Sequence, residues 1–303
     1  MTYDLVIIGA DSAGLSAGIY AGRKKMNTVI LTKKVGGQSL YTNSIENYPG
    51  FLKIAGVDLI SKMKEQAENF GVLLREGVEV KSILKKEGSL AVMTDENEYY
   101  ARTVIVASGS EWKKLDVPGE DEFMGKGVSV CAICDAPFYS GKDVAVVGGG
   151  NSAFESAQDL LAYANKIYVL QHSKEFIGDK VMFERLKKED KIEFLTNAET
   201  REIKGSNFVE GLVYEDLNSG KTKELKVGGV FVNVGRLPNT AFLGGFLNLN
   251  DYKEVIIDHK TCTTSVPGVF SAGDVTDVKY KQSIIAAASG VTAALSAHEY
   301  LSR

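Results

Sequence analysis

Short runs of aliphatic and β-branched residues alternate along the chain with glycine-rich turns and with segments whose apolar residues recur at helical spacing. The first series begins near the N-terminus, with an apolar run over Leu5–Ile8, a glycine turn over residues 9–14, a helical stretch over Leu15–Arg23 and an apolar run over Thr28–Leu31. Strand, glycine turn, helix and strand in this order predict a βαβ unit with parallel strands.

The same series occurs again in the middle of the chain. It comprises an apolar run over Asp143–Val147, a glycine turn over residues 148–153, a helical stretch over Phe154–Ala164 and an apolar run over Ile167–Leu170. Each series is typical of the start of a nucleotide-binding fold. We therefore predict an α/β fold with two doubly wound dinucleotide-binding (Rossmann-like) domains.

Further apolar segments extend both predicted domains. Short strands are expected within Val78–Val92, Tyr99–Val106 and Gly229–Gly235. The run Val269–Asp274 precedes a final helix, which is expected over Ser283–Leu301. The second domain is predicted to be inserted into the first. Residues 1–116 and 245–303 would form the first domain, and residues 117–244 the second.

Composition and charge narrow the function classes. The chain has 303 residues, of which 44% are hydrophobic and 24% charged, which is ordinary for a globular protein of about two domains. The net charge is -4, and cations are interleaved with anions, as in Glu184–Asp190. Since no basic stripe could neutralise a row of phosphates, nucleic acid is not expected as a partner.

The distribution of apolar residues and cysteines predicts the compartment. The first apolar run is too short for the core of a signal peptide, and no segment approaches the ~20 apolar residues that a membrane span needs. We therefore expect a cytoplasmic protein with no membrane partner. Three cysteines are too few for a disulfide scaffold, and two of them form a C-x-x-C pair, which indicates redox or metal chemistry.

The second glycine turn matches a dinucleotide-binding pattern. Gly148, Gly150 and Ala153 stand at the positions of G-x-G-x-x-G/A, between a predicted strand and a predicted helix. The backbone N–H groups of such a turn, with Asn151 and Ser152 at the helix start, can face a pyrophosphate. We interpret this turn as a nicotinamide-dinucleotide site rather than as a tight turn without a ligand.

The first glycine turn departs from the pattern. Gly9 and Gly14 are in place, but Asp11 occupies the middle position, where a glycine lets the backbone approach the pyrophosphate. A carboxylate at this position lies near the phosphate charges unless it turns away. Asp11 therefore predicts either a weakened affinity for the dinucleotide or a rearranged turn.

The C-x-x-C pair, Cys131 and Cys134, can close a small disulfide ring and act as a reversible two-electron carrier. The alternatives are half of a zinc site or two packed cysteines. A zinc site needs two further ligands at matching spacing, and no remaining cysteine or histidine has it. We favour redox chemistry and expect no metal.

Asp135 directly follows the second cysteine. A partly buried carboxyl group at this position can have a raised pKa and can protonate a leaving thiolate. Asp135 can equally be a turn-forming residue before Pro137. The residues themselves do not decide between these two interpretations.

Several motifs occur in one order along the whole chain. They are Gly36-Gly37-Gln38, the run over residues 46–51, the run over residues 131–135, the Gly148 turn, and the run over residues 264–275 followed by Tyr280-Lys281-Gln282. Together they resemble low-molecular-weight thioredoxin reductases, and they are also similar to the reductase portion of the alkyl hydroperoxide reductase flavoprotein. The resemblance implies a homodimeric flavoenzyme that passes electrons from a donor through FAD to the C-x-x-C pair and on to a thioredoxin-like protein.

The resemblance also implies roles for individual residues. Cys134 would face the flavin, Cys131 would attack the protein substrate, and Asp135 would donate the proton. Since the C-terminal FAD motif is intact, we expect FAD to bind despite Asp11. The residues implied to hold FAD are Gly9, Ser12, Gly14, Gln38, Asn47, Gly273, Asp274, Lys281 and Gln282.

The order of the motifs separates the flavin from the dithiol. The first domain would bind FAD, while the second would carry both the dithiol and the nicotinamide turn. A disulfide stacked against the flavin cannot also meet a protein substrate, and the family resolves this by rotating one domain against the other. We expect the hinges near Val117-Pro118-Gly119 and Leu243-Gly244-Gly245.

The electron donor is less clearly indicated than the cofactor. NADPH-dependent members of the family carry a basic cluster after the second strand of the nucleotide domain, but residues 170–177 include no arginine. His172 and Lys174 are poor substitutes for bidentate pairing of arginine with phosphate. NAD-preferring sites usually offer an acidic residue to the ribose diol, but Gln171 is neutral. We expect NADH rather than NADPH.

Three alternatives to this function stay open. A ferredoxin or another protein carrier could be the donor, a peroxiredoxin system could be the acceptor through a small redoxin, and the chain could be a flavin redox sensor without steady turnover. Cys262 is expected to be a packed free thiol and His298 a structural residue of the last helix, and Trp112 is assigned no role.

Overall fold

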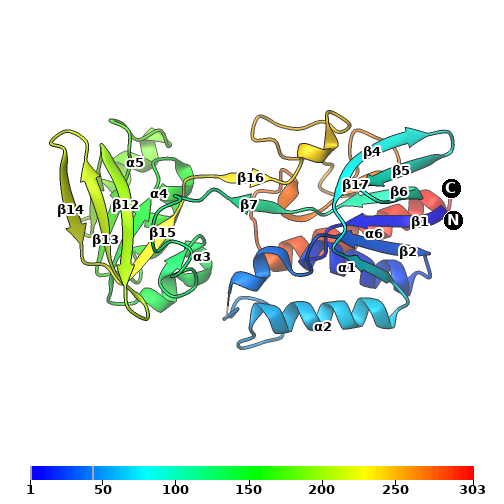
Figure 1. Cartoon of the computed structure of the whole chain (residues 1–303), viewed down its shortest axis with the longest axis horizontal. Helices are drawn as coiled ribbons and strands as arrows, with labels where there is room; N and C mark the ends of the chain where they lie inside the picture. Colours follow the sequence, from blue (N-terminus) through cyan, green and yellow to red (C-terminus); the bar gives the residue numbers. More distant parts are fainter. Residues whose placement is uncertain (1, 43) are drawn as a thin grey trace. The chain divides into compact units, whose positions relative to one another are not determined.

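The chain crosses twice between two structural units in the computed structural model, which describes residues 2–42 and 44–303 (Figure 1). Unit 1 comprises the chain up to Glu111 together with Leu237–Arg303, and unit 2 comprises Trp112–Arg236. The prediction of one α/β unit inserted into another is confirmed. Both crossings lie a few residues earlier in the chain than the expected boundaries.

Unit 1 contains a seven-stranded sheet in the order β3-β2-β1-β6-β5-β4, with β17 also paired to β6. The predicted strand region Val78–Val92 forms a hairpin, because Gly88 adopts a φ of 70° at its turn. All other strand pairs in this sheet, except β5 with β6, are parallel. The strands are β1 (Thr2–Ile8), β2 (Thr28–Thr32), β3 (Leu73–Glu76), β4 (Val80–Lys86), β5 (Ser89–Thr94), β6 (Glu98–Val106) and β17 (Val269–Ser271).

Three helices pack with this sheet. Helix α1 contacts both α2 and α6, and the three lie together on one side of the sheet (Figure 1). The bounds of α6 agree with the sequence prediction, whereas α1 begins three residues earlier than predicted, because Asp11 caps it. No helix was predicted at α2. The helices are α1 (Ser12–Arg23), α2 (Gly56–Asn69) and α6 (Ser283–Leu301), with short 3-10 helices η1 (Gly37–Tyr41), η3 (Ala241–Leu243) and η4 (Gly273–Val275).

Unit 2 is a three-layer structure around a parallel sheet in the order β11-β10-β9-β15-β8. Alternate residues of β9 point to opposite layers: Val144 and Val146 pack with the helices, and Ala145 and Val147 with a second, antiparallel sheet. The parallel strands are β8 (Val128–Ser129), β9 (Asp143–Val147), β10 (Lys166–Leu170), β11 (Ile192–Leu195) and β15 (Gly229–Val232).

The two outer layers of unit 2 complete its core. The helices are α3 (Ala132–Asp135), η2 (Ala136–Tyr139), α4 (Asn151–Leu160) and α5 (Lys180–Leu186). The predicted helix Phe154–Ala164 is therefore shifted, since α4 begins at the glycine turn and ends at Leu160. The antiparallel sheet, which was not predicted, contains β12 (Ala198–Gly205), β13 (Val209–Asp216) and β14 (Lys221–Leu225).

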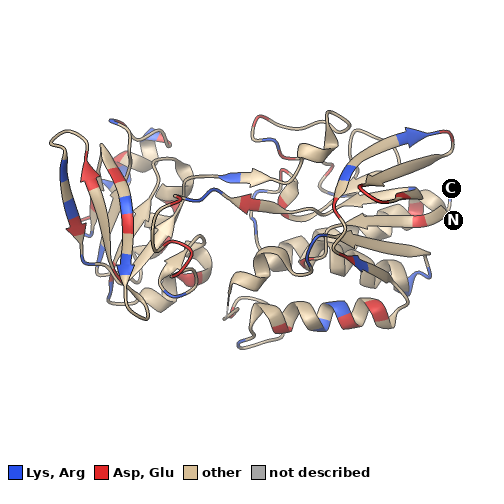
Figure 2. Ribbon diagram, viewed as in Figure 1, with Lys and Arg blue, Asp and Glu red and all other residues tan. Residues whose placement is uncertain are grey.

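The antiparallel sheet carries charges of both signs (Figure 2). Ion pairs join neighbouring strands: the guanidinium of Arg201 lies 2.8 Å from a carboxylate oxygen of Glu215, and the ammonium of Lys223 lies 2.8 Å from Asp216. Such exposed pairs contribute little to stability. Cations and anions thus alternate on this sheet, so its charged face is a solvated surface and not a basic stripe that could bind phosphates.

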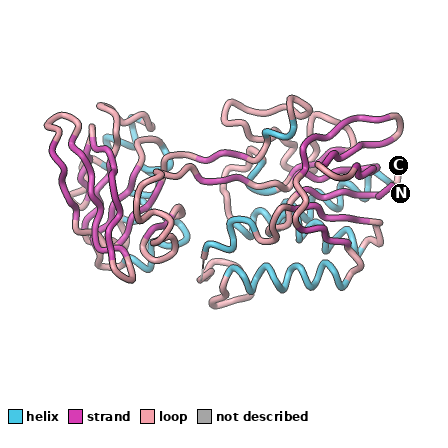
Figure 3. Tube along the Cα trace, viewed as in Figure 1, coloured by secondary structure: helices cyan, strands magenta, loops and turns pink. Residues whose placement is uncertain are grey.

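The two crossings between the units pair with each other. Strands β7 (Ser110–Trp112) and β16 (Arg236–Pro238) form a two-stranded sheet (Figure 3). The expected hinge residues instead lie within the units: a Cβ on Gly119 would stand 1.9 Å from the carbonyl oxygen of Ile203, and Leu243 is buried in the core of unit 1. The Pro-Gly and Gly-Gly signals therefore mark turns inside the units.

In the part of the chain that the structure describes, no helix is both long and apolar enough to cross a membrane.

Candidate active site

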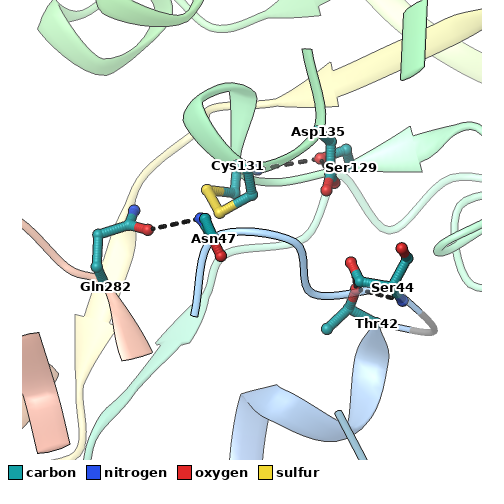
Figure 4. Close-up of a disulfide and its surroundings, with 8 residues drawn as sticks. Thr42, Ser44, Asn47, Ser129, Cys131, Asp135 and Gln282 are labelled. Carbon is teal, nitrogen blue, oxygen red and sulfur yellow. Dashed lines mark hydrogen bonds between the residues drawn. A yellow bond between two sulfur atoms is a disulfide. The ribbon is translucent and has the colours of Figure 1, made fainter. Parts of the chain in front are cut away.

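Cys131 and Cys134 are joined by a disulfide in unit 2 (Figure 4). The carbonyl oxygen of Cys131 accepts hydrogen bonds from the backbone N–H groups of Cys134 and Asp135, at 3.2 and 3.1 Å. This tight turn places the two cysteine Cα atoms 5.3 Å apart, which is ordinary spacing for a disulfide. The sulfur atoms of the C-x-x-C pair are thus positioned for a reversible two-electron change.

The Asp135 carboxylate is held by Ser129. The hydroxyl of Ser129 donates to Asp135 Oδ2 at 2.6 Å and accepts a hydrogen bond from the Cys131 N–H at 3.1 Å (Figure 4). Burial raises the pKa of Asp135, and the hydrogen bond from Ser129 opposes that rise. A carboxyl group with a raised pKa retains its proton closer to neutral pH, which favours the proton-donor interpretation of Asp135 over a turn-forming role.

The first glycine turn brings α1 close against β1. A Cβ on Gly14 would lie 1.9 Å from the carbonyl oxygen of Gly9, so only glycine permits this approach. The N-terminus of α1 also meets that of α6, because the hydroxyl oxygens of Ser12 and Ser283 lie 2.6 Å apart. Two helix N-termini direct partial positive charge to one region, which fits a pyrophosphate.

Asp11 is the N-cap of α1, and its side chain turns toward η1. Asp11 Oδ1 accepts hydrogen bonds from the Ser12 N–H at 2.7 Å and from the Ser39 hydroxyl at 2.6 Å. Its neighbour Gly37 has a φ of 43°, and a Cβ there would lie 2.8 Å from Asp11 Oδ2. Asp11 thus joins the glycine turn to the segment that carries Gln38.

Two of the residues implied to hold FAD contact each other in unit 1. The side-chain amide of Asn47 donates to Gln282 Oε1 at 3.3 Å (Figure 4). Gln282 is the N-cap residue of α6. The amide of Gln38 donates to the carbonyl oxygen of Ser110. These contacts fix the side-chain amide of Gln282 at the start of α6 and that of Gln38 in η1.

The C-terminal motif is held by a half-buried ion pair. The ammonium of Lys281 lies 2.8 Å from a carboxylate oxygen of Glu254 and donates to the carbonyl oxygen of Asp274 at 3.3 Å. The Gly273 N–H donates to the Ser289 hydroxyl at 3.0 Å. Lys281 therefore fixes the segment between η4 and α6, and the residues of unit 1 fit a bound FAD, with the charge of Asp11 as the exception.

The second glycine turn is tightly packed at one end and open in its middle. A Cβ on Gly148 would lie 2.3 Å from the carbonyl oxygen of Asn233, whereas a Cβ on Gly150 would have no neighbour within 4 Å. Ala153 is buried under the turn, Ser152 is exposed, and the side chain of Asn151 accepts the Asp179 N–H. The open space at Gly150, at the N-terminus of α4, fits a pyrophosphate.

Gln171 lies beneath this turn. It is buried, and a Cβ on Gly149 would lie 2.2 Å from its amide nitrogen. Its side chain therefore supports the turn instead of extending to a ribose. His172 and Lys174, which follow it, are exposed.

Three residues that contact the candidate site residues were not predicted from the sequence. Ser129 stands two residues before the redox pair, Ser39 contacts Asp11, and Glu254 pairs with Lys281. Serine and glutamate are common, and no spacing rule marks them. Only Ser129 could have been considered, from its place beside the C-x-x-C pair. Among residues 2–42 and 44–303, no group of three His, Cys, Asp or Glu side chains could hold a metal.

Comparison with known proteins shows similarity over nearly the whole chain. The sequence is 38% identical over 302 residues to a component of alkyl hydroperoxide reductase from Staphylococcus aureus, and 40% identical over 301 residues to a Bacillus subtilis protein called NADH dehydrogenase. Each match covers 99% of this chain and 59% of the relative, so the chain spans under two thirds of the length of these curated relatives.

One solved structure matches this chain over nearly the full length of both proteins. The thioredoxin reductase from Giardia duodenalis has a TM-score of 0.95 and 35% sequence identity, and the match covers 100% of this chain and 99% of that one. The prediction of a fold like that of the low-molecular-weight thioredoxin reductases is confirmed.

The sequence family described as pyridine nucleotide-disulphide oxidoreductase matches residues 3–290. This range includes the redox disulfide, both glycine turns and the C-terminal motif. Proteins of this kind bind FAD, as the sequence predicted. The chain therefore belongs to the pyridine nucleotide-disulphide oxidoreductases and is a thioredoxin reductase-like flavoenzyme.

Proposed function

We propose that the chain passes electrons from NADH through FAD to the Cys131–Cys134 disulfide and on to a disulfide of a thioredoxin-like protein. The observation that carries this proposal is the bonded cysteine pair with the half-buried Asp135 beside it, in the same unit as an open glycine turn. Relative rotation of the two units would give the pair access to both of its reaction partners.

FAD, when bound, supplies a two-electron carrier between the donor and the disulfide. Reduction breaks the S–S bond and adds two electrons and two protons, which leaves two thiols. Asp135 provides a proton to the leaving sulfur. The Cys131 thiolate then attacks the partner's disulfide, and Cys134 displaces the reduced partner and reforms the intramolecular bond.

The loop after β10 supports NADH as the donor. No arginine is present in residues 170–177, and Gln171 is packed under the turn. Within residues 170–177, His172 and Lys174 are the side chains left to pair with a 2′-phosphate, and both are exposed. The name NADH dehydrogenase of the Bacillus subtilis relative agrees with this preference.

The names of the relatives support two acceptors. The Giardia protein is a thioredoxin reductase and is matched over nearly its whole length. The Staphylococcus aureus relative is a component of alkyl hydroperoxide reductase. A thioredoxin-like protein is therefore the first candidate acceptor, and a small redoxin that serves a peroxide-reducing system is the second.

The proposal is tested by anaerobic bleaching of the flavin absorbance with NADH and, separately, with NADPH. Fast bleaching by NADH and slow bleaching by NADPH are expected. In Cys134→Ser, bleaching should persist while reduction of thioredoxin disulfides is lost. Cys262→Ser, which changes a buried thiol outside the redox pair, should retain both activities.

Two results would refute parts of this proposal. A yellow protein that neither nucleotide bleaches would make a protein electron donor the leading alternative. Survival of disulfide reduction in Cys134→Ser would show that the pair is not the working dithiol.

A further inference from the structure

We propose that Asp11 is a built-in anion at the diphosphate site of unit 1, and that FAD binds there together with one proton, which neutralises this carboxylate. The inference rests on FAD as the cofactor of the proposed function. It does not depend on the electron donor or on the acceptor protein.

The Asp11 carboxylate already occupies donors at the start of α1. It accepts hydrogen bonds from the Ser12 N–H at 2.7 Å, the Ser39 hydroxyl at 2.6 Å and the Ser39 N–H at 3.4 Å. The first of these is a helix N-terminal amide of the kind that binds phosphate in dinucleotide sites. An anion of the protein itself thus uses part of the α1 N-terminus.

The rest of the site is suited to a second anion. The Ser12 and Ser283 hydroxyl oxygens, at the starts of α1 and α6, lie 2.6 Å apart, so two helix N-termini favour negative charge in one region. A diphosphate bound by these N-termini adds like charge beside the Asp11 carboxylate. Like charges in a buried site favour the neutral form of a carboxyl group.

No cation offsets this charge. The Asp11 carboxylate accepts hydrogen bonds from the hydroxyl and N–H groups of Ser12 and Ser39, and within the described parts of the chain no Lys, Arg or His forms an ion pair with it. Burial raises the pKa of Asp11, and the hydrogen bonds from Ser39 and Ser12 oppose that rise. Protonation is therefore the available way to remove the repulsion.

Two further ionisable residues, Asp274 and Lys281, belong to the segments next to the start of α1. Asp274 is a carboxylate in η4, directly after Gly273, whose Cβ would lie 2.8 Å from that of Ala13 in α1. Lys281, before α6, is paired with Glu254. Asp274→Asn therefore belongs in the experiment, to distinguish its titration from that of Asp11.

The sign of the effect follows from proton linkage. If binding takes up a proton, FAD affinity increases as the pH falls, and it decreases by up to about tenfold per pH unit once Asp11 is ionised in the free protein. Asn at position 11 has nearly the same size and no charge. In Asp11→Asn, FAD affinity should be independent of this titration and tighter than in the wild type at high pH.

The test is calorimetric titration of flavin-free protein with FAD at pH 6, 7 and 8, in pairs of buffers with different ionisation enthalpies. At pH 8 the wild type should take up about one proton per FAD, and Asp11→Asn about none. The FAD affinity of the variant relative to that of the wild type should increase from pH 6 to pH 8. Asp58→Asn, an exposed acidic residue in the first turn of α2, is the matched control and should behave like the wild type.

Absence of proton uptake by the wild type would overturn the proposal, as would an unchanged proton count in Asp11→Asn. If Asp11→Asn does not fold, the number of protons that the wild type takes up per FAD tests the proposal. Asp274→Asn should then take up the same number of protons, which would exclude Asp274 as the group that is protonated. FAD binding without pH dependence would overturn this inference alone. Failure to bind FAD at every pH would also remove the cofactor on which the proposed function rests.

Discussion

The hydroxyl group of Ser129 makes two hydrogen bonds, one as a donor and one as an acceptor. It donates its proton to the Asp135 carboxylate and accepts the Cys131 N–H, so it links the redox pair to the proposed proton donor. The donated hydrogen bond stabilises the charged form of Asp135 and lowers its pKa, against the effect of burial. Ser129 is therefore a positioning residue that limits how far the Asp135 pKa rises.

Ser129→Ala should raise the pKa of Asp135 further, because the charged carboxylate loses its donor while burial remains. The step that needs protonated Asp135 declines as the pH rises through this pKa. The alkaline limb of the rate of thioredoxin reduction should thus move to higher pH, as measured by single-turnover reduction across a pH series.

Two controls separate this effect from a general loss of structure. Ser129→Thr retains a hydroxyl and should restore the pH profile of the wild type. In an Asp135→Asn background, Ser129→Ala should not move the limb, and the rate itself should be lower by about 10²-fold. A limb that stays in place in Ser129→Ala would contradict the assigned link.

Cys262 should react slowly with thiol reagents in the native protein. Its thiol donates to the carbonyl oxygen of Ser289, and burial, with the nearby Asp258, raises its pKa to about 11. At pH 8 about one thiol in a thousand is then ionised. After anaerobic reduction, Ellman's reagent should detect two fast thiols, with the third appearing in denaturant. Three fast thiols in the native protein would show that Cys262 is accessible.

Among the elements, the glycine turns before α1 and α4 contain positions that differ in their room for a side chain. Gly14 and Gly148 have no room for a side chain, because backbone oxygens stand 1.9 and 2.3 Å from their Cβ positions. Gly150 has open space at its Cβ and an ordinary φ of -100°. A methyl group at Gly150 would thus affect a bound ligand and leave the packing of the protein intact.

Gly150→Ala should raise the KM for NADH about tenfold, equivalent to about 1.4 kcal/mol, without a change in melting temperature or FAD content. Steady-state kinetics with excess thioredoxin would measure the change. Gly148→Ala is the contrasting variant and should lose thermal stability, since its Cβ would collide with the backbone of residue 233. An unchanged KM in Gly150→Ala would place the nucleotide elsewhere.

At the scale of the whole molecule, the chain's one tryptophan lies at a crossing between the units. The guanidinium carbon of Arg236 lies 3.6 Å from the centroid of the Trp112 ring, and both residues belong to the paired strands β7 and β16. This stacking joins the outgoing crossing to the returning one. Trp112, to which the sequence assigned no role, therefore reports on the crossings.

If the units rotate at these crossings, Trp112 emission should change when the disulfide is reduced anaerobically. The expected control is Arg236→Ala, which removes the stacked guanidinium and should shift the emission of the oxidised protein by itself. An emission spectrum that is identical in the oxidised and reduced enzyme would indicate that the crossings do not move.

The homodimer expected from the resemblance stays a prediction. Light scattering should give twice the 32.8 kDa mass of one chain, independent of FAD content. A mass of one chain would contradict it.

The parts predicted correctly are those in which local pattern and tertiary environment agree. Runs such as Leu5–Ile8 and Val144–Val147 are uniformly apolar because both faces of these strands are buried, so they are visible in the sequence. The sheet β12–β14 was missed because its two outer strands, β12 and β14, are exposed at many positions and rich in charge, which weakens their apolar signal.

The sequence by itself determined the two repeated βαβ series, the insertion of one unit into the other, the redox pair and the glycine turns, because each depends on residue types at short spacing. The tertiary structure decided which distant groups complete them. Ser39 reaches Asp11, Ser283 reaches Ser12, and Glu254 reaches Lys281. These contacts join loops at the ends of different elements, and only the packing of α1 and α6 with their sheet brings those ends together.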